Sequence, residues 1–155
     1  MMSTIPKTAE KRIRDGIKKY KNILKTAKDR DVNESDTVTI VNDMLADICG
    51  YDKYTEITRE FAIRGTYCDL AIKLEEKLIF LIEVKAIGIE LKENHLRQAL
   101  QYASSSGVEW VILTNGDRWQ ANRVIFEKPI KTEVAFDFSF IDPPKITKLI
   151  EFFSY

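Results

Sequence analysis

The stretch CDLAIKLEEKLIFLIEVK, residues 68–85, restricts the fold more than any other part of the sequence. Two apolar runs flank a short charged segment, which is the pattern of a β-hairpin. The first run opens with Asp69, and the second ends with Glu83 and Lys85. A run as apolar as LIFLI belongs in the interior of a sheet. Charged residues at the end of such a strand therefore need a partner or a ligand.

The register of this hairpin decides whether the two carboxylates meet. Side chains alternate between the two faces of a strand, so Glu83 and Lys85 share a face. If residues 75–77 form the loop, Asp69 lies directly opposite Glu83, with Cβ atoms roughly 5 Å apart. A two-residue loop would put the two carboxylates on opposite faces. A site built from both residues therefore requires a loop of odd length, or a β-bulge with the same effect.

Opposed carboxylates repel each other, and a hard divalent cation such as Mg²⁺ relieves that repulsion with oxygen ligands. A lysine beside the metal can orient a water molecule or stabilise charge that develops on a phosphate. Asp69, Glu83 and Lys85 thus outline a site that cleaves phosphodiesters. The alternative interpretation is a Lys–Glu ion pair at a solvated sheet end, with Asp69 capping a strand.

Two helices are expected before the hairpin. Residues 8–28 and about 33–48 carry apolar side chains at helical spacing, and Gly50 is a suitable end for the second helix. The positions expected to face inward are Ile13, Ile17, Tyr20, Leu24 and Ala27 in the first helix, and Val38, Val41, Met44, Leu45 and Ile48 in the second.

The rest of the chain alternates strand and helix patterns. Strands are expected at 55–63, 67–74 and 77–87, a helix at 91–107, two strands within 109–128 around the turn signal Asn115-Gly116, a short strand or extended tail at 133–141, and a helix at 146–153. This order predicts an α/β fold with a mixed β-sheet flanked by helices.

Length and composition fit a single globular domain. The chain has 155 residues, of which 45% are hydrophobic and 31% are charged. No segment approaches the roughly 20 apolar residues that a membrane span needs, so no membrane partner is expected. Two cysteines fit a reducing compartment, and we expect a cytoplasmic protein.

Charge is unevenly distributed along the chain. Residues 1–30 hold ten Lys/Arg against three Asp/Glu, a net of +7, and the remainder carries −7 because the whole chain balances to zero. A basic arm beside an acidic body suits contact with phosphates, while the body holds a cation. A solvated helix face is the alternative interpretation.

The motif set resembles the PD-(D/E)xK, or restriction-endonuclease-like, nuclease superfamily. Its elements are Asp69, the E-x-K that begins at Glu83, and a Q-x-x-x-Y pattern at Gln98 and Tyr102. Together they are similar to the N-terminal nuclease domain of type I restriction enzyme R subunits, over roughly residues 30–126. On this basis the chain is one nuclease domain, with a basic N-terminal helix (1–30), a nuclease core (31–126) and a C-terminal strand and helix (127–155).

The resemblance assigns roles to residues of the hairpin. It implies that Asp69 and Glu83 are metal ligands, with the carbonyl of Val84 as a further ligand. Lys85 would be the catalytic lysine. Glu34 would be the helix carboxylate that completes the catalytic set, and Asp36, two positions away, competes for this role. Cys68 stands where the superfamily motif has proline.

Three further residues are expected near the DNA. Gln98 and Tyr102 are i and i+4 on one helical face, where the resemblance implies contact with the metal shell or a DNA phosphate. Arg64 is the best candidate among the arginines for a phosphate contact. From the residues alone, the pair at Gln98 and Tyr102 also fits a polar stripe on a buried helix. His95, the single histidine, is expected on a helix surface or at an interface.

The sequence therefore predicts a Mg²⁺-dependent DNA endonuclease, with Mn²⁺ as an alternative cofactor. The resemblance implies DNA as a partner, together with a homodimer or the subunits of a restriction–modification system. No G-x-x-x-x-G-K-[ST] segment occurs, so we expect no ATP site in this chain, which suits a standalone relative or an excised domain. The competing hypotheses are a binding module of the same fold that does not cleave, and a domain that serves only assembly.

Overall fold

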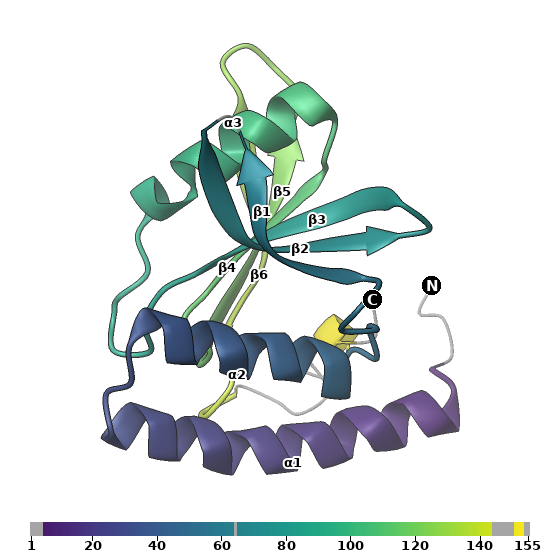
Figure 1. Cartoon of the computed structure of the whole chain (residues 1–155), viewed down its shortest axis with the longest axis vertical. Helices are drawn as coiled ribbons and strands as arrows, with labels where there is room; N and C mark the ends of the chain where they lie inside the picture. Colours follow the sequence, from purple (N-terminus) through teal and green to yellow (C-terminus); the bar gives the residue numbers. More distant parts are fainter. Residues whose placement is uncertain (1–4, 64, 144–150, 154–155) are drawn as a thin grey trace.

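A six-stranded mixed sheet forms the centre of the protein, with helices on both faces (Figure 1). The structure is a computed structural model that describes residues 5–63, 65–143 and 151–153. The strands are β1 (Ile57–Ile63), β2 (Thr66–Leu74), β3 (Lys77–Val84), β4 (Trp110–Thr114), β5 (Arg118–Ile125) and β6 (Lys131–Ser139). The helices are α1 (Lys7–Asp29), α2 (Glu34–Asp47), the 3₁₀ helix η1 (Glu93–Leu96) and α3 (Arg97–Ser106).

The strands lie side by side in chain order, which confirms the α/β fold with a mixed sheet. Neighbouring strands are antiparallel except β3 and β4, which are parallel and are joined through η1 and α3. A parallel pair requires such a crossover because the chain must return to the same end of the sheet. The segment expected as a strand or an extended tail at 133–141 is a strand, β6, paired with β5.

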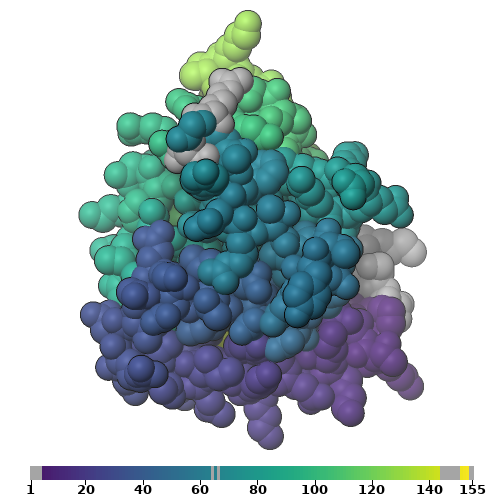
Figure 2. All heavy atoms as spheres, in the orientation of Figure 1, coloured from purple at the N-terminus to yellow at the C-terminus, as the bar shows by residue number. Residues whose placement is uncertain are grey.

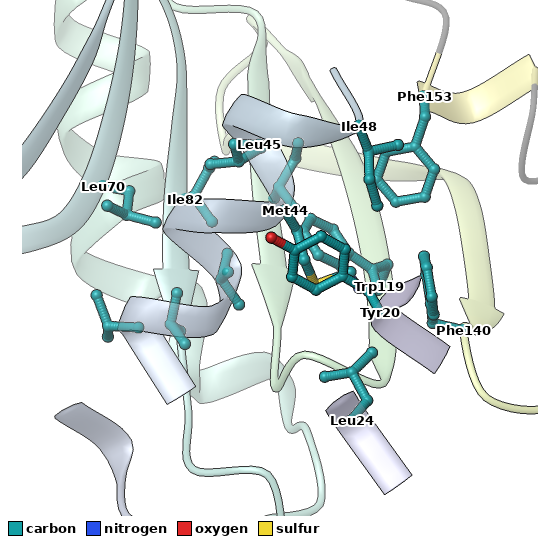
Figure 3. Packing of buried hydrophobic residues seen from close by; sticks show 14 of the residues in the cluster. Tyr20, Leu24, Met44, Leu45, Ile48, Leu70, Ile82, Trp119, Phe140 and Phe153 are labelled. Atoms are coloured by element: carbon teal, nitrogen blue, oxygen red, sulfur yellow. The ribbon is translucent and has the colours of Figure 1, made fainter. Parts of the chain in front are cut away.

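Two hydrophobic cores occupy the two faces of the sheet. The first lies under α1 and α2, where Figure 3 shows Tyr20, Met44 and Trp119 close together. The second lies under α3 and is smaller, with Ala71 and Leu81 of the hairpin packed against Ala99 and Ala103 of the helix. Figure 2 shows the same orientation with all atoms, and α1 forms its lower margin.

Both N-terminal helices have the buried faces that their apolar periodicity predicts. All ten residues expected to face inward are buried. The side chain of Asn33 caps α2 by accepting a hydrogen bond of 2.8 Å from the backbone N–H of Asp36. Within the described part of the chain, no helix combines the length and apolar character that a membrane crossing requires. Of the helix expected at 146–153, only residues 151–153 are described, and these are helical.

The β2–β3 hairpin differs from the predicted three-residue loop. Leu74 pairs with Lys77, so the turn contains only Glu75 and Glu76, with φ values of +52° and +67°. Such left-handed pairs match the twist of two-residue hairpins. By itself this turn would put the two carboxylates on opposite faces. The three-residue loop considered from the sequence does not form, whereas the strand expected to begin at Lys77 does.

A β-bulge restores the register that the site needs. Lys73 pairs with Leu78, but Ile72 pairs with Phe80, so Ile79 is an extra residue on β3. The pairing then continues to Leu70 opposite Ile82, and the next positions toward the strand ends are Asp69 and Glu83. The extra residue turns every later side chain of β3 to the other face. The sequence analysis gave a β-bulge as the alternative to a loop of odd length, and the structure has this bulge.

Deletion of Ile79 should leave the outer register of the hairpin intact. Ile79 is the extra residue, so without it Lys73 still pairs with Leu78 and Ile72 with Phe80, and Leu81, Ile82 and Glu83 keep their faces. Only the half-buried Ile79 side chain is lost, so we expect the free energy of unfolding to fall by about 1 kcal/mol. Urea unfolding followed by circular dichroism measures the loss.

Deletion of both Ile79 and Phe80 should destabilise the protein severely. No extra residue remains to absorb the second deletion, so Leu81 and Ile82 exchange faces and Glu83 moves away from Asp69, at a cost of several kcal/mol. The double deletion should melt well below the deletion of Ile79 alone. Equal melting temperatures for the two variants would show that the bulge does not set the register.

Candidate active site at the ends of β2 and β3

Two half-buried carboxyl groups meet at the ends of the central hairpin. Asp69 on β2 and Glu83 on β3 are each two residues from Ala71 and Leu81, which face α3. The carboxyl groups therefore lie on the α3 side of the sheet, and they are within hydrogen-bonding contact of each other. The bulge at Ile79 produces this juxtaposition, since it brings the two positions into opposition.

Main-chain and thiol groups hold the pair in place. The backbone N–H of Val84 donates a 2.8 Å hydrogen bond to Oδ2 of Asp69. The buried thiol of Cys68 donates to the carbonyl of Ile82 at 3.2 Å and also contacts the carboxyl of Glu83. The position before Asp69 is therefore part of the support of the site. Sequence reasoning noted Cys68 only as a departure from a motif.

Burial makes ionisation of both carboxyl groups unfavourable. Desolvation raises the pKa of Glu83 from its ordinary 4.5 to about 7, and the charge of Asp69 adds to the rise. The pKa of Asp69 is also raised, first by burial and then by the charge of Glu34, although the Val84 N–H opposes this shift. A bound cation would favour the ionised form of both carboxyl groups, which burial and their mutual repulsion disfavour.

Lys85 supplies the positive charge that acts on both carboxyl groups of the pair. It follows β3 directly, is half-buried, and its backbone N–H donates to the carbonyl of Thr114 on β4 at 2.9 Å. Its charge lowers the pKa of both Asp69 and Glu83. Neither carboxyl group forms an ion pair within 4.0 Å in the described part of the chain. Lys85 is therefore near the pair without neutralising it by direct contact.

Glu34 approaches the pair from the start of α2, whereas Asp36 does not. The charge of Glu34 raises the pKa of Asp69. Asp36 instead lines a groove between α1 and α2 beside Asn22 and Thr39. A hydrogen bond of 3.2 Å from the backbone N–H of Ile87 to Oγ1 of Thr37 ties this end of α2 to the loop after Lys85. Of the two acidic candidates, the structure thus brings Glu34 to the site.

His95 also belongs to this group of charges. Burial lowers its pKa, followed by the charges of Lys85 and Lys92, while Glu34 acts in the opposite direction. Its ring is held by the backbone N–H of Lys92, which donates to Nδ1 at 3.1 Å. The sequence analysis placed His95 on a helix surface or at an interface and did not connect it with the site. His95 lies ten positions after Lys85, and a loop separates them. Helix or strand periodicity therefore could not predict that the two residues are close in space.

Two of the remaining predicted residues, Gln98 and Tyr102, lie on α3. Gln98 is exposed in the first turn of the helix. Tyr102, one turn later, packs its ring edge-on against Phe61 of β1, with 5.7 Å between ring centroids. Phe61 pairs with Cys68, the neighbour of Asp69, so Tyr102 lies over the strand beside the site. Arg64 lies outside the described residues.

The donor set suits a cation that keeps part of its water shell. Among residues 5–63, 65–143 and 151–153, no three His, Cys, Asp or Glu side chains form a group able to hold a metal. The carboxyl groups of Asp69 and Glu83, which lie within hydrogen-bonding contact, are both oxygen donors. Mg²⁺ is commonly bound by one or two carboxylates and completes its shell with water and substrate phosphates. The residues present therefore fit Mg²⁺.

Comparison with known proteins gives one family match. A family model described as "Type I restriction enzyme R protein N terminus (HSDR_N)" matches residues 39–134. The matched region contains Asp69, Glu83 and Lys85, while Glu34 lies before it. Searches of curated proteins and of solved structures gave no match.

The metal-free protein should lose stability as the pH rises from about 4.5 to about 7. In this window Glu83 holds its proton in the folded state but not in the unfolded state, because its pKa is about 7 rather than 4.5. The folded state then binds more protons, so its stability is complete below this window and is lost as the pH rises through it. The loss is on the order of 3 kcal/mol.

Urea unfolding in EDTA at pH 5 and pH 8 tests this linkage. Glu83→Gln removes the ionisable group with little change in shape, so it should reduce the pH dependence and be more stable than wild type at pH 8. Parallel pH profiles for the two proteins would show that Glu83 ionises freely in the folded state.

Proposed function

The chain belongs to the type I restriction enzyme R protein N-terminal family, and we propose that it is a Mg²⁺-dependent DNA endonuclease, with Mn²⁺ as an alternative cofactor. The observation that carries the proposal is the pair of half-buried carboxyl groups at Asp69 and Glu83, with Lys85 beside them. Burying two carboxyl groups destabilises the fold, and apolar residues at these positions would avoid that cost. Their presence therefore favours a functional role over a structural one.

The metal would be held by Asp69 and Glu83, with the carbonyl of Val84 as a further ligand and Glu34 in support. When bound, the cation would supply Lewis-acid stabilisation of the charge that develops on the phosphodiester. The Val84 N–H keeps the Asp69 carboxylate oriented, which reduces the reorganisation needed on binding. Glu83 would hold the cation as a carboxylate, and its pKa of about 7 means that it can give up its proton near neutral pH.

Lys85 would act on the substrate. An ammonium group at the strand end can orient the attacking water or stabilise the negative charge on the phosphate oxygens. Gln98, on the exposed side of α3, would contact a DNA phosphate at the rim of the site. Tyr102 would serve mainly to hold α3 over β1, given its ring contact with Phe61.

A binding module that does not cleave is the second candidate function. Its support is that only two carboxyl groups, rather than three metal-ligating side chains, come together within the described residues. The description of the family refers to the R protein of a type I restriction enzyme. The proposal also includes binding to partner subunits of such an enzyme or to a second copy of the chain. It further includes a cytoplasmic location.

Lys85→Ala should abolish DNA cleavage while the fold is retained. Loss of one group that stabilises the transition state typically lowers the rate by roughly 100-fold or more. Nicking and linearisation of a plasmid, and cleavage of a labelled single strand, are measured in Mg²⁺ or Mn²⁺. Lys92→Ala is the control, because Lys92 is an exposed lysine near the site, and it should cut like wild type. Equal cleavage by both variants would remove Lys85 from the catalytic set.

Glu34→Gln should weaken the response to divalent cation more than Asp36→Asn does. Glu34 acts electrostatically on Asp69, whereas Asp36 faces the groove between the helices. The measurement is the rise in melting temperature during a Mg²⁺ or Mn²⁺ titration, with Asp69→Asn as the reference for a lost site. A stronger effect of Asp36→Asn would reverse the assignment, and no cation response in wild type would favour the module that does not cleave.

A further inference from the structure

A stripe of basic side chains follows the outer face of α1. Successive members are separated by three or four residues, so at 100° per residue they fall within an arc of about 80°. We call this set the α1 basic stripe: Lys7, Lys11, Arg14, Lys18, Lys21 and Lys25. All are exposed except the half-buried Lys21. The buried residues of α1 lie on the other side of the helix.

Most of the stripe has no acidic partner. Arg14 pairs with Glu10 at 3.0 Å, but no ion pair involves the five lysines within the described part of the chain. Lysines of the same helix that lie outside the stripe behave differently. Lys19 pairs with Asp47 at 3.4 Å, and Lys28 pairs with Asp117 at 3.5 Å. The unpaired charge of α1 is therefore concentrated on the face that points away from the protein.

This arrangement works against the stability of the helix itself. Like charges at i,i+3 and i,i+4 repel, and a solvated helix face is more stable with alternating acids and bases. The rest of the chain carries the compensating net charge of −7, yet none of its described acidic residues forms an ion pair with the stripe. A continuous row of unpaired cations is the arrangement that an extended polyanion relieves.

We propose that the α1 basic stripe binds the phosphate backbone of duplex DNA as a surface distinct from the cleavage site. The identity of the polyanion as DNA rests on the proposed endonuclease function. From Lys7 to Lys25 the stripe extends about 27 Å, the length of roughly eight base pairs. Figure 1 shows α1 along the outer edge of the molecule, so a straight rod of this length has access to it.

The end of the stripe also leads toward the site. α1 ends at Asp29, and α2 begins at Glu34, the carboxylate that acts on Asp69. The connecting segment contacts the loop after Lys85, because a Cβ atom at Gly88 would meet the carboxylate of Asp31. Contacts between the stripe and the DNA phosphates would thus hold a duplex beside the carboxyl pair without sequence specificity.

The chemistry of α1 distinguishes DNA from an anionic membrane. A basic helix that lies on a membrane inserts an apolar face among the acyl chains. The apolar face of α1 is already buried in the first core, through Ile13, Ile17 and Leu24. Only charge remains available on the outer face, and charge alone suits a phosphate backbone.

The triple variant Lys11→Gln, Lys18→Gln, Lys25→Gln should bind duplex DNA at least tenfold more weakly at 100 mM salt, an order-of-magnitude estimate from counterion release. The slope of log affinity against log salt should decrease by about 2 to 3, because each lost phosphate contact contributes about 0.9. The probe is a fluorescein-labelled blunt duplex of random sequence, about 30 base pairs long, measured by polarisation in EDTA at several salt concentrations. EDTA prevents cleavage, so the measurement is independent of catalysis.

The matched control is Lys77→Gln, Lys128→Gln, Lys131→Gln, which removes the same charge from exposed positions outside α1. It should bind like wild type. The stripe variant should also melt at or above the wild-type temperature, since like-charge repulsion is removed, so misfolding would not account for weaker binding. Unchanged binding by the stripe variant, or equal losses in both variants, would overturn the proposal.

A cleavage assay separates this proposal from the endonuclease proposal. The stripe variant should retain the turnover of wild type at saturating DNA, whereas Lys85→Ala should bind DNA normally without cutting it. Binding through the stripe with no cleavage by any protein would sustain the surface and overturn the enzyme. Stronger salt-sensitive binding to anionic vesicles than to DNA, lost in the stripe variant, would overturn DNA as the partner.

Discussion

The opposition of Asp69 and Glu83 is the constraint on which the rest of the structure depends. Two carboxyl groups on neighbouring strands repel each other, and burial raises the pKa of both. The fold tolerates the pair because the strands that carry it are embedded in two hydrophobic cores, one on each face of the sheet. The bulge at Ile79 sends Leu81 into one core and Ile82 into the other, and the same displacement turns Glu83 toward Asp69. Packing and chemistry therefore share a single register.

The elements around this hairpin divide support and chemistry between them. The parallel pairing of β3 with β4 continues to the backbone of Lys85, which holds the lysine at the sheet edge. The first turn of α2 is tied to the next loop through Thr37, and it presents Glu34 to the carboxyl pair. The crossover that the parallel pair requires carries His95 and then α3 over the same face. The crossover between β3 and β4 thus brings a titratable group, His95, near the site.

Charge is separated in space as well as along the chain. The end of the β2–β3 hairpin concentrates carboxyl groups, and the outer face of α1 concentrates lysines. A net charge of zero hides both features, because they cancel in the sum but not in the local field. Under the proposed function this separation would serve a polyanionic substrate, since the carboxyl groups alone would repel it.

The sequence by itself determined the order of the helices and strands and the buried faces of α1 and α2. Ile13 to Ala27 in α1 and Val38 to Ile48 in α2 could be assigned from a 3.6-residue period, because burial in a helix depends only on local spacing. The positions of Asp69, Glu83 and Lys85 at strand ends followed from the apolar runs beside them. Only the tertiary structure decided that the hairpin turns through two residues with a bulge, that Glu34 rather than Asp36 acts on the pair, and that His95 lies near Lys85 and Glu34. These features depend on turn geometry and on contacts between segments distant in the chain, for which local periodicity carries no signal.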